Sequence, residues 1–404
     1  MPAFDIPLRP TYVQAIISAL ERVFRTGWHA DRAIREQFKA NALWSGEEQA
    51  FVVTAFYDTI RYYRLLHTII GKEPVASEDW WPLFGALLIL QGRKLPGWQE
   101  FKGLDAASLA NRYAKLKGQR AFRESIPDWL DALGEQELGD RWDNILQALN
   151  QSPPTVIRAN RLKTTVEELK SLLWKESIGV RPLGGEALWV ETPANIFRTQ
   201  AFRAGLFEVQ DFNSQQVALF LDVQPGMRVI DACAGAGGKT LHLAALMQNK
   251  GQLIALDTED WKLEDLRRRA RRAGAGGIDT RLINSSKIIK RLDSSADRLL
   301  LDVPCSGLGV LRRNPDAKWS LQPDYLERLR ELQQSILQSY CRMCKPGGKM
   351  VYATCSILPS ENEAQIKQFL DQKGDAFNLL EMQTLAPDRT GFDGFFVAVF
   401  ERKA

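Results

Sequence analysis

Two cysteines that each follow a strand-like apolar segment are the residues of this chain best suited to chemistry. Cys305 follows the segment 298–303 and one proline, and Cys355 follows the segment 349–354. If these segments are neighbouring strands of a parallel sheet, both thiols project into one crevice at its carboxyl edge. A thiolate is soft, is partly ionised near neutral pH, and adds to electron-poor carbon better than oxygen does. The pair is therefore a candidate for covalent catalysis.

A glycine-rich loop is the second candidate for a functional role. Residues 231–242 read Asp-Ala-Cys-Ala-Gly-Ala-Gly-Gly-Lys-Thr-Leu-His, between a strand-like and a helix-like segment. Such a loop lets the backbone approach a ligand closely, and the helix N-terminus favours an anionic group. A P-loop would need glycine in place of Cys233, and a dinucleotide fingerprint would need glycine in place of Thr240. S-adenosylmethionine fits what remains, with its ribose hydroxyls at Asp257, which ends the next strand. The alternative is a tight turn with a purely structural role.

The elements that must position these groups divide the chain into three segments. Residues 1–150 show apolar residues at helical spacing over 13–24 and 51–60, and a short apolar helix over 81–90. Two consecutive prolines at 153 and 154 end this helical segment. Residues 151–205 predict a small α+β module, with strands at 155–160, 188–190 and 202–209 and a helix at 165–176.

From residue 206 onward, strands and helices alternate along the chain. This order is typical of an open α/β sheet with parallel strands. The strands are expected at 228–231, 251–257, 280–284, 298–303, 349–354 and 395–400. The helices are expected at 239–247, 261–273, 326–344 and 363–370.

Composition narrows the class of protein. The chain has 404 residues, of which 45% are hydrophobic and 25% charged, which is typical of a folded protein of two or three domains. No apolar run reaches the ~18 to 20 residues that a membrane span needs. Five cysteines, an odd count, argue against a disulfide framework, so we expect a cytoplasmic protein in a reducing compartment with no membrane partner. Cys341 and Cys344 form a C-x-x-C pair without a second pair, and we expect no metal.

Five segments resemble the motifs of RNA (cytosine-5)-methyltransferases of the RsmB/NOP family. The core motifs are Asp-Ala-Cys-Ala-Gly-Ala-Gly-Gly-Lys-Thr at 231–240, Leu-Asp-Val-Pro-Cys-Ser-Gly-Leu-Gly at 301–309 and Tyr-Ala-Thr-Cys-Ser at 352–356. Residues 205–215 resemble the segment that introduces the catalytic domain, and residues 391–398 resemble the closing strand. The resemblance covers 153–404, and the motifs occur in family order. The N-terminal helices resemble the NusB-like domain of the bacterial 16S rRNA branch, often called RsmB.

This resemblance implies a fold and an activity. The expected fold class is α/β: a Rossmann-like class I methyltransferase domain over 206–404, with a mixed, mostly parallel seven-stranded sheet. A small α+β, RRM-like module over 151–205 and an all-α, NusB-like RNA-binding domain over 1–150 precede it. The implied reaction transfers a methyl group from S-adenosylmethionine to carbon 5 of a cytosine in RNA, with 16S rRNA favoured by the N-terminal domain. The alternatives are a tRNA substrate, a non-catalytic RNA-binding or ribosome-assembly factor, and an NAD-dependent oxidoreductase.

The resemblance also implies roles for individual residues. Cys355 is the nucleophile that attacks carbon 6, Cys305 is needed for product release, and Asp302 faces both cofactor and cytosine. The implied cofactor-binding residues are Cys233, Ala234, Gly235, Ala236, Gly237, Gly238, Lys239, Asp257, Asn284 and Asp302. The family usually has Ala-Pro at 235–236 and an aspartate at 284. Since an amide both donates and accepts, Asn284 can still meet the adenine edge. Lys239 either neutralises charge near the site or merely starts the helix.

Basic residues in two places are candidates for RNA contacts. Arg158, Arg161 and Lys163 form a compact cluster in the small module, for which a solvated edge is the alternative. Arg312, Arg313 and Lys318 lie in the loop after Cys305 and are better placed to hold an RNA backbone. The arginine-rich run 267–272 on a predicted helix is more typical of a solvated face, although it could touch phosphate. The net charge of +4 permits a nucleic-acid partner without requiring one.

Overall fold

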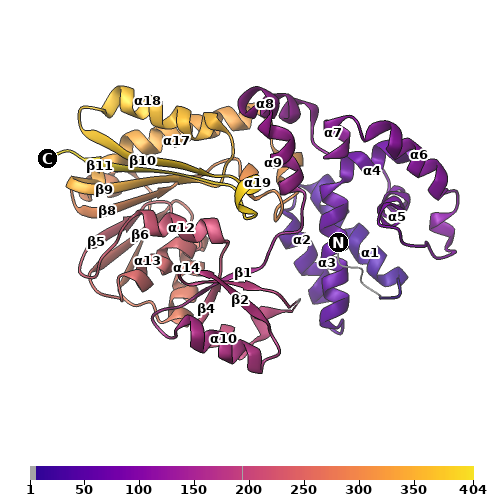
Figure 1. Ribbon diagram of the computed structural model, residues 1–404, viewed down its shortest axis with the longest axis horizontal. Helices are drawn as coiled ribbons and strands as arrows, with labels where there is room; N and C mark the ends of the chain where they lie inside the picture. The colour runs from indigo at the N-terminus through magenta and orange to yellow at the C-terminus, as the bar shows by residue number, and fades with distance from the viewer. Residues whose placement is uncertain (1–5, 193) are drawn as a thin grey trace. The chain divides into compact units, whose positions relative to one another are not determined.

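The computed structural model describes residues 6–192 and 194–404, and the chain divides into two compact units (Figure 1). One unit comprises Met1–Ser152 and Leu311–Leu321, and the other comprises Pro153–Val310 and Gln322–Ala404. The small module that the sequence separates at 151–205 therefore shares a unit with the α/β sheet. A short segment beyond Cys305 belongs instead to the unit of the N-terminal helices.

The first unit is built from helices. Their bounds are α1 (Pro10–Thr26), α2 (Ala30–Ala40), α3 (Gly46–Arg61), α4 (Tyr63–Ile70), α5 (Trp80–Leu90), α6 (Ala106–Leu116), α7 (Arg120–Arg123), α8 (Asp128–Leu138), α9 (Arg141–Leu149) and α16 (Ala317–Ser320). Helix α3 begins with a capping box, in which the Ser45 side chain accepts from the Glu48 N–H and the Glu48 side chain accepts from the Ser45 N–H. Helices α1, α3 and α5 confirm the three helices predicted in this part of the chain.

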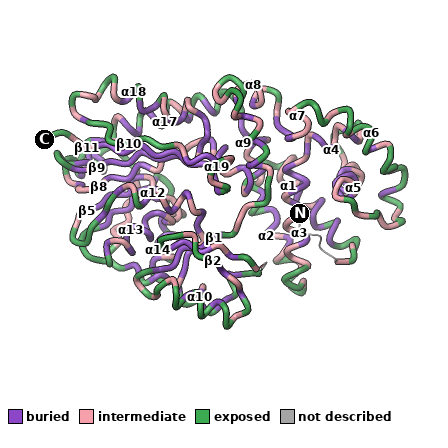
Figure 2. The backbone as a smooth tube through the Cα atoms, in the orientation of Figure 1, coloured by how far each residue is buried: buried purple, intermediate pink, exposed green. Residues whose placement is uncertain are grey.

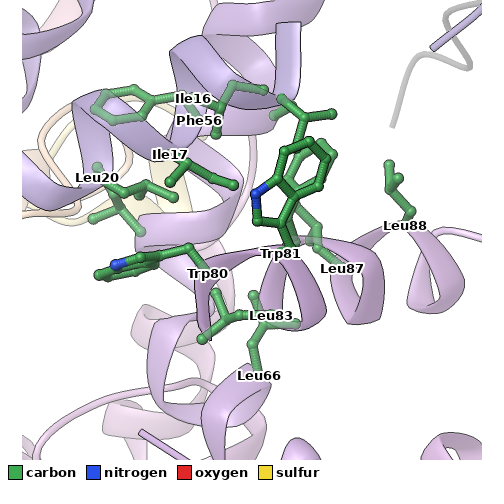
Figure 3. Close-up of a cluster of buried hydrophobic side chains, with 14 of the residues drawn as sticks. Ile16, Ile17, Leu20, Phe56, Leu66, Trp80, Trp81, Leu83, Leu87 and Leu88 are labelled. Carbon is green, nitrogen blue, oxygen red and sulfur yellow. The ribbon is translucent and has the colours of Figure 1, made fainter. Parts of the chain in front are cut away.

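The core of this unit forms around α5. This helix is apolar on nearly every side, so it must be surrounded by other helices rather than lie on a surface. Figure 3 shows Trp80, Trp81 and Leu83 of α5 among Ile16, Ile17 and Leu20 of α1, Phe56 of α3 and Leu66 of α4. Burial of such large side chains is the main favourable term in holding the helices together.

The second unit begins with a small antiparallel sheet. Among the described residues its strand order is β2-β3-β1-β4, formed by β1 (Val156–Ala159), β2 (Val180–Gly184), β3 (Ala187–Val190) and β4 (Phe207–Val209), with α10 (Val166–Lys175) and α11 (Gln200–Arg203). The predicted strand at 202–209 is wrong in its first half. There the chain forms α11 instead. The Thr199 hydroxyl caps this helix by accepting a hydrogen bond from the Phe202 N–H, 3.0 Å away.

The main sheet of the second unit has seven strands within the described residues. In the order β10-β11-β9-β8-β5-β6-β7 they are β5 (Arg228–Asp231), β6 (Gln252–Asp257), β7 (Ile278–Leu282), β8 (Ala296–Asp302), β9 (Cys344–Thr354), β10 (Phe377–Leu385) and β11 (Phe395–Arg402). Strands β5 to β9 pair in parallel, and β11 runs antiparallel to both β9 and β10. This confirms the predicted Rossmann-like, mostly parallel sheet.

Helices cover both faces of this sheet, and its central strands are buried on both sides (Figures 1 and 2). Helices α12 (Phe212–Phe220), α13 (Gly238–Leu246) and α14 (Asp260–Ala273) pack on one face, and α15 (Ser286–Arg291), α17 (Pro323–Tyr340) and α18 (Glu363–Lys373) pack on the other. The short helix α19 (Pro387–Thr390) precedes β11. The helix predicted at 326–344 ends four residues early, because Cys344 already begins β9.

Candidate active site

The two cysteines meet at the carboxyl edge of the main sheet. Strands β8 and β9 are parallel neighbours in which Asp302 pairs with Ala353, so the segments after them leave the sheet side by side. The Sγ atoms of Cys305 and Cys355 lie 3.3 Å apart, within hydrogen-bonding distance for sulfur. Both residues are partly exposed.

A close backbone contact holds the two cysteine segments together. The Gly309 N–H donates to the Cys355 carbonyl oxygen at 2.9 Å, and the Gly394 N–H donates to the Gly309 carbonyl oxygen at 2.7 Å. A Cβ at position 309 would lie 2.3 Å from the Gly394 oxygen and 2.7 Å from the Cys355 oxygen. Only glycine allows this approach, which the Ser-Gly-Leu-Gly sequence after Cys305 provides.

The environment of the Cys305 thiol opposes the loss of its proton. The hydrogen bond with Cys355 is the main cause that raises the pKa of Cys305 well above its ordinary value, and burial and the charge of Cys355 act in the same direction. The protonated form of Cys305 is therefore favoured while the Cys355 sulfur is its neighbour.

A buried ion pair lies at the same edge. The Lys239 Nζ atom is 2.6 Å from an Asp302 carboxylate oxygen, and Lys239 is only 9% exposed. Burial alone would lower the pKa of Lys239, but the charge and hydrogen bond of Asp302 outweigh it and raise that pKa. The charge of Cys355 raises it further. Lys239 is therefore a fixed cation beside the Asp302 carboxylate and near the Cys355 sulfur.

The glycine loop lies next to this edge of the sheet, in a backbone conformation that requires glycine. Gly235 and Gly237 have φ angles of +54° and +87°, which side chains rarely allow, and a Cβ on Gly237 would lie 2.6 Å from Leu266. The Gly235 N–H donates to a carboxylate oxygen of Asp257 at 2.9 Å, so the acid at the end of β6 fixes the loop. The loop leads into the N-terminus of α13, whose first N–H groups favour an anion.

Asp231, which sequence reasoning passed over, ends β5 under this loop. One carboxylate oxygen accepts from the Thr240 hydroxyl at 2.7 Å, and the other is buried without a partner among the described residues. Burial raises the pKa of Asp231 to about 7, the Thr240 hydrogen bond opposes this rise, and the charge of Asp302 adds to it. Its position at the end of a predicted strand, directly before the glycine loop, is the sequence signal that could have identified Asp231 as a site residue.

Comparisons with known proteins agree with this geometry. A model of the 16S rRNA methyltransferase RsmB/F family matches residues 218–401, and a model of the ferredoxin-like domain of such methyltransferases matches residues 126–197. The ribosomal RNA small subunit methyltransferase B of Pasteurella multocida is 37% identical, over 83% of this chain and 77% of that protein. The protein of the same name from Vibrio cholerae is 32% identical, over 77% of this chain and 76% of that protein. The chain belongs to the RsmB/F methyltransferase family. It is thus an RNA methyltransferase.

Solved structures support the assignment of the fold. The crystal structure of PH0851 matches with a TM-score of 0.83 and 26% identity, over 98% of this chain and all of that one (100%). A methyltransferase homologue from Pyrococcus horikoshii matches with a TM-score of 0.62 and 30% identity, over 70% of this chain and 98% of that one.

In this member of the RsmB/F family, Arg158 supports the glycine loop, and its prediction as an RNA contact is wrong. Arg158 is 3% exposed, and its Nη1 donates to the Gly238 carbonyl oxygen at 3.1 Å and to Gln210. Arg269 donates to the Ala236 carbonyl oxygen at 2.8 Å. Burial lowers the pKa of Arg158 to about 10, which leaves it charged at neutral pH. Arg158 and Arg269 thus each bind a main-chain carbonyl oxygen of the glycine loop.

The other basic residues predicted to contact RNA differ in exposure. Arg312 and Lys318 are buried within the first unit, so this part of the prediction is wrong: Arg312 donates to the Ala148 carbonyl oxygen at 2.9 Å and Lys318 to the Arg61 carbonyl oxygen at 2.8 Å. Buried side chains bound to main-chain oxygens are not available to phosphate. Arg313 is half-buried, and Arg161 and Lys163 are exposed.

Lys163 is partly engaged in spite of its exposure. Its Nζ donates to the carbonyl oxygens of Ala204 and Arg272, at 2.8 and 2.7 Å. Arg161 pairs with Glu186 at 3.3 Å and remains open to solvent. An RNA contact by Arg161, Lys163 or Arg313 stays a prediction.

Asn284 and the C-x-x-C pair lie apart from the cysteine site. Asn284 is exposed, two residues beyond the end of β7 at Leu282. Cys341 and Cys344 are buried free thiols at the start of β9, and burial raises the pKa of Cys344 to about 12. Over residues 6–192 and 194–404, no cluster of three possible metal ligands occurs. Nor does any described helix have the length and hydropathy to cross a membrane.

Proposed function

We propose that this RNA methyltransferase transfers a methyl group from S-adenosylmethionine to carbon 5 of a cytosine in RNA, through a covalent bond between Cys355 and carbon 6. The observation that carries the proposal is the pair of sulfurs 3.3 Å apart, with the Lys239–Asp302 ion pair at the same sheet edge. Two converging thiols next to a fixed cation suit addition to an aromatic carbon and later release. 16S rRNA is the favoured substrate, as the matching family is described as 16S rRNA methyltransferases.

The residues present fit S-adenosylmethionine. When bound, it supplies an electrophilic methyl group on a sulfonium. The N-terminus of α13 suits its carboxylate, and Asp257, whose two oxygens each accept one backbone N–H, keeps lone pairs for the ribose hydroxyls. The unpartnered buried oxygen of Asp231 is an acceptor close to the loop and suits a cationic ligand. Asn284 is proposed to meet the adenine edge.

The chain's own residues account for the remaining chemistry. Carbon 5 of cytosine is a weak nucleophile until the Cys355 sulfur bonds to carbon 6, which makes the ring an enamine. In this proposal Asp302 holds the amino group and ring nitrogen of the cytosine. The hydrogen bond from Lys239 to the Asp302 carboxylate supports this role, because it keeps the carboxylate oriented. Once the Cys355 sulfur is bonded to carbon 6, it no longer holds the proton on Cys305, which passes to solvent. After methylation, the Cys305 thiolate takes the proton from carbon 5, the ring double bond re-forms, and Cys355 leaves with the electrons of its bond to carbon.

The test is to identify the modified nucleoside. The protein is incubated with labelled S-adenosylmethionine and, in separate reactions, with a 16S rRNA transcript and with tRNA. The RNA is then digested and analysed by mass spectrometry. The proposal expects label in 5-methylcytidine from the rRNA, and none with Cys355→Ala. Label in another nucleoside would overturn it. Label found only in tRNA would show that the substrate is tRNA and would leave the proposed chemistry unchanged. Absence of label from a protein that binds the cofactor would favour a non-catalytic RNA-binding role.

A further inference from the structure

One buried carboxylate lies beneath both cysteine segments. Glu361 ends a short helical turn after β9 and is 0% exposed. The residues that follow the two cysteines, Ser306 and Ser356, both reach it. Since each serine is covalently adjacent to its cysteine, a group that holds both serines also constrains both sulfurs.

The Glu361 carboxylate is bound on both oxygens. Oε1 accepts from the Ser306 N–H at 2.8 Å and from the Gln333 amide at 2.9 Å. Oε2 accepts from the Ser306 hydroxyl at 2.5 Å and from the Ser356 hydroxyl, and the two hydroxyl oxygens are themselves 3.2 Å apart. Hydrogen bonds to a buried ionised group are among the stronger ones in proteins. One oxygen atom thus joins the two cysteine segments.

Further contacts fix the carboxylate itself. The Tyr352 hydroxyl of β9 donates to the Glu361 carbonyl oxygen at 2.8 Å. The Gln333 amide of α17 also donates to the carbonyl oxygen of Pro304 at 3.0 Å, directly before Cys305. Glu361 is therefore anchored independently of the serines, and it can act as a fixed reference for their positions.

We propose that Glu361 is a positioning residue that sets the separation of the Cys305 and Cys355 sulfurs, and so governs whether the covalent intermediate proceeds to product. This inference rests on the proposed function. In the release step, Cys305 must reach the proton on carbon 5 while Cys355 is still bonded to carbon 6. The Cys305 thiol first loses its own proton to solvent, because the bonded Cys355 sulfur no longer raises its pKa. The proton of carbon 5 then goes to the Cys305 thiolate, the electrons of the carbon–hydrogen bond form the ring double bond, and those of the carbon–sulfur bond return to Cys355.

A carboxylate is required at this position because all its partners are donors. In Glu361→Gln, one end of the amide becomes a donor that faces either the two hydroxyls or the Ser306 N–H and the Gln333 amide. If the amide nitrogen faces the hydroxyls, the acceptor that they share is lost. If it faces the Ser306 N–H and the Gln333 amide, donor groups oppose each other and the Ser306 segment is pushed away. The cysteine segments can then separate, which affects proton removal by Cys305 more than the first attack by Cys355.

The experiment is a single-turnover assay with labelled S-adenosylmethionine and a 16S rRNA transcript, resolved on a denaturing gel. For Glu361→Gln, the ratio of covalent protein–RNA adduct to released methylated RNA is expected to rise roughly tenfold to a hundredfold, in line with the loss of a charge-assisted hydrogen bond. A purely structural role would reduce the amount of active protein and leave this ratio unchanged. An unchanged ratio would overturn the inference.

Matched variants keep the result interpretable. Glu363→Gln changes the same group two residues away, where it accepts from Thr384 instead, and should keep the wild-type ratio. If Glu361→Gln does not fold, Ser356→Ala is used, because it cuts the Cys355 segment from the carboxylate and leaves the Ser306 bonds in place. Ser356→Ala should also raise the ratio of covalent adduct to released methylated RNA, and a wild-type ratio would refute the inference. Absence of methylated RNA with wild-type protein would instead refute the proposed function, and the inference with it.

Discussion

Replacing Asp231 by asparagine should remove a pH-dependent penalty from the stability of the free protein. In the folded chain, burial raises the pKa of Asp231 to about 7 from an ordinary value of 3.8. The folded state therefore binds a proton more tightly than the unfolded state does. The contribution of this protonation to the free energy of unfolding is fully present below about pH 4 and is lost as the pH rises through about 7. Asparagine cannot ionise, so the variant lacks this loss.

The size of the effect follows from the shift in the Asp231 pKa. A rise of about three pKa units corresponds to a loss of about 4 kcal/mol in the free energy of unfolding between about pH 4 and pH 8. His242 acts in the opposite direction, because burial lowers its pKa to about 4, so its contribution is lost as the pH falls. The difference between the two proteins at each pH therefore isolates Asp231.

The assay is urea unfolding followed by circular dichroism at several pH values between about 4 and 8. Asp231→Asn should gain stability relative to the wild type as the pH rises. Asp265→Asn on α14 is the control, since Asp265 is partly exposed and pairs with Arg268, and its difference from the wild type should be small and flat. Parallel profiles for Asp231→Asn and the wild type would refute the reasoning that burial controls this carboxyl.

Three further substitutions test the support of the site. Lys239→Met should lower the methylation rate by about a hundredfold, since it leaves the Asp302 charge unpaired; a change below twofold in kcat would contradict this. Gly309→Ala should cost about 1–3 kcal/mol of stability by overpacking, and slow alkylation of Cys355, whose carbonyl it displaces; an unchanged Tm would count against it. Arg158→Met should weaken S-adenosylmethionine binding about tenfold by freeing a loop carbonyl; equal affinity in calorimetry would disprove that role.

The sequence predicts the main sheet well where burial is strong. Strands β5, β6, β8 and β9 are buried on both faces, so each is a continuous apolar run that ends at a polar or reactive residue. Strand β10 was missed because most of its residues are exposed and show no alternation. Strand β2 was missed for a related reason, since it contains Pro182 and Gly184.

Contacts between distant parts of the chain could not be predicted from one sequence. The Glu361 carboxylate joins Ser306, Gln333 and Ser356, and no local periodicity marks that group. The basic residues after Cys305 were assigned to RNA because their charge and position suggested an open loop. The burial of Arg312 and Lys318 depends on main-chain oxygens of helices more than 140 residues earlier in the chain, which charge patterning does not reveal.

The roles of the two cysteines can be tested most directly by trapping the covalent intermediate. Wild type, Cys305→Ala and Cys355→Ala are incubated with labelled S-adenosylmethionine and a 16S rRNA transcript, and run on a denaturing gel. The account predicts a labelled, RNase-sensitive slow band for Cys305→Ala alone, because attack and methylation proceed but release fails. Cys355→Ala should give neither band nor methylated RNA. A trapped band with Cys355→Ala, or full methylation by that variant, would contradict the assignment of Cys355 as the nucleophile.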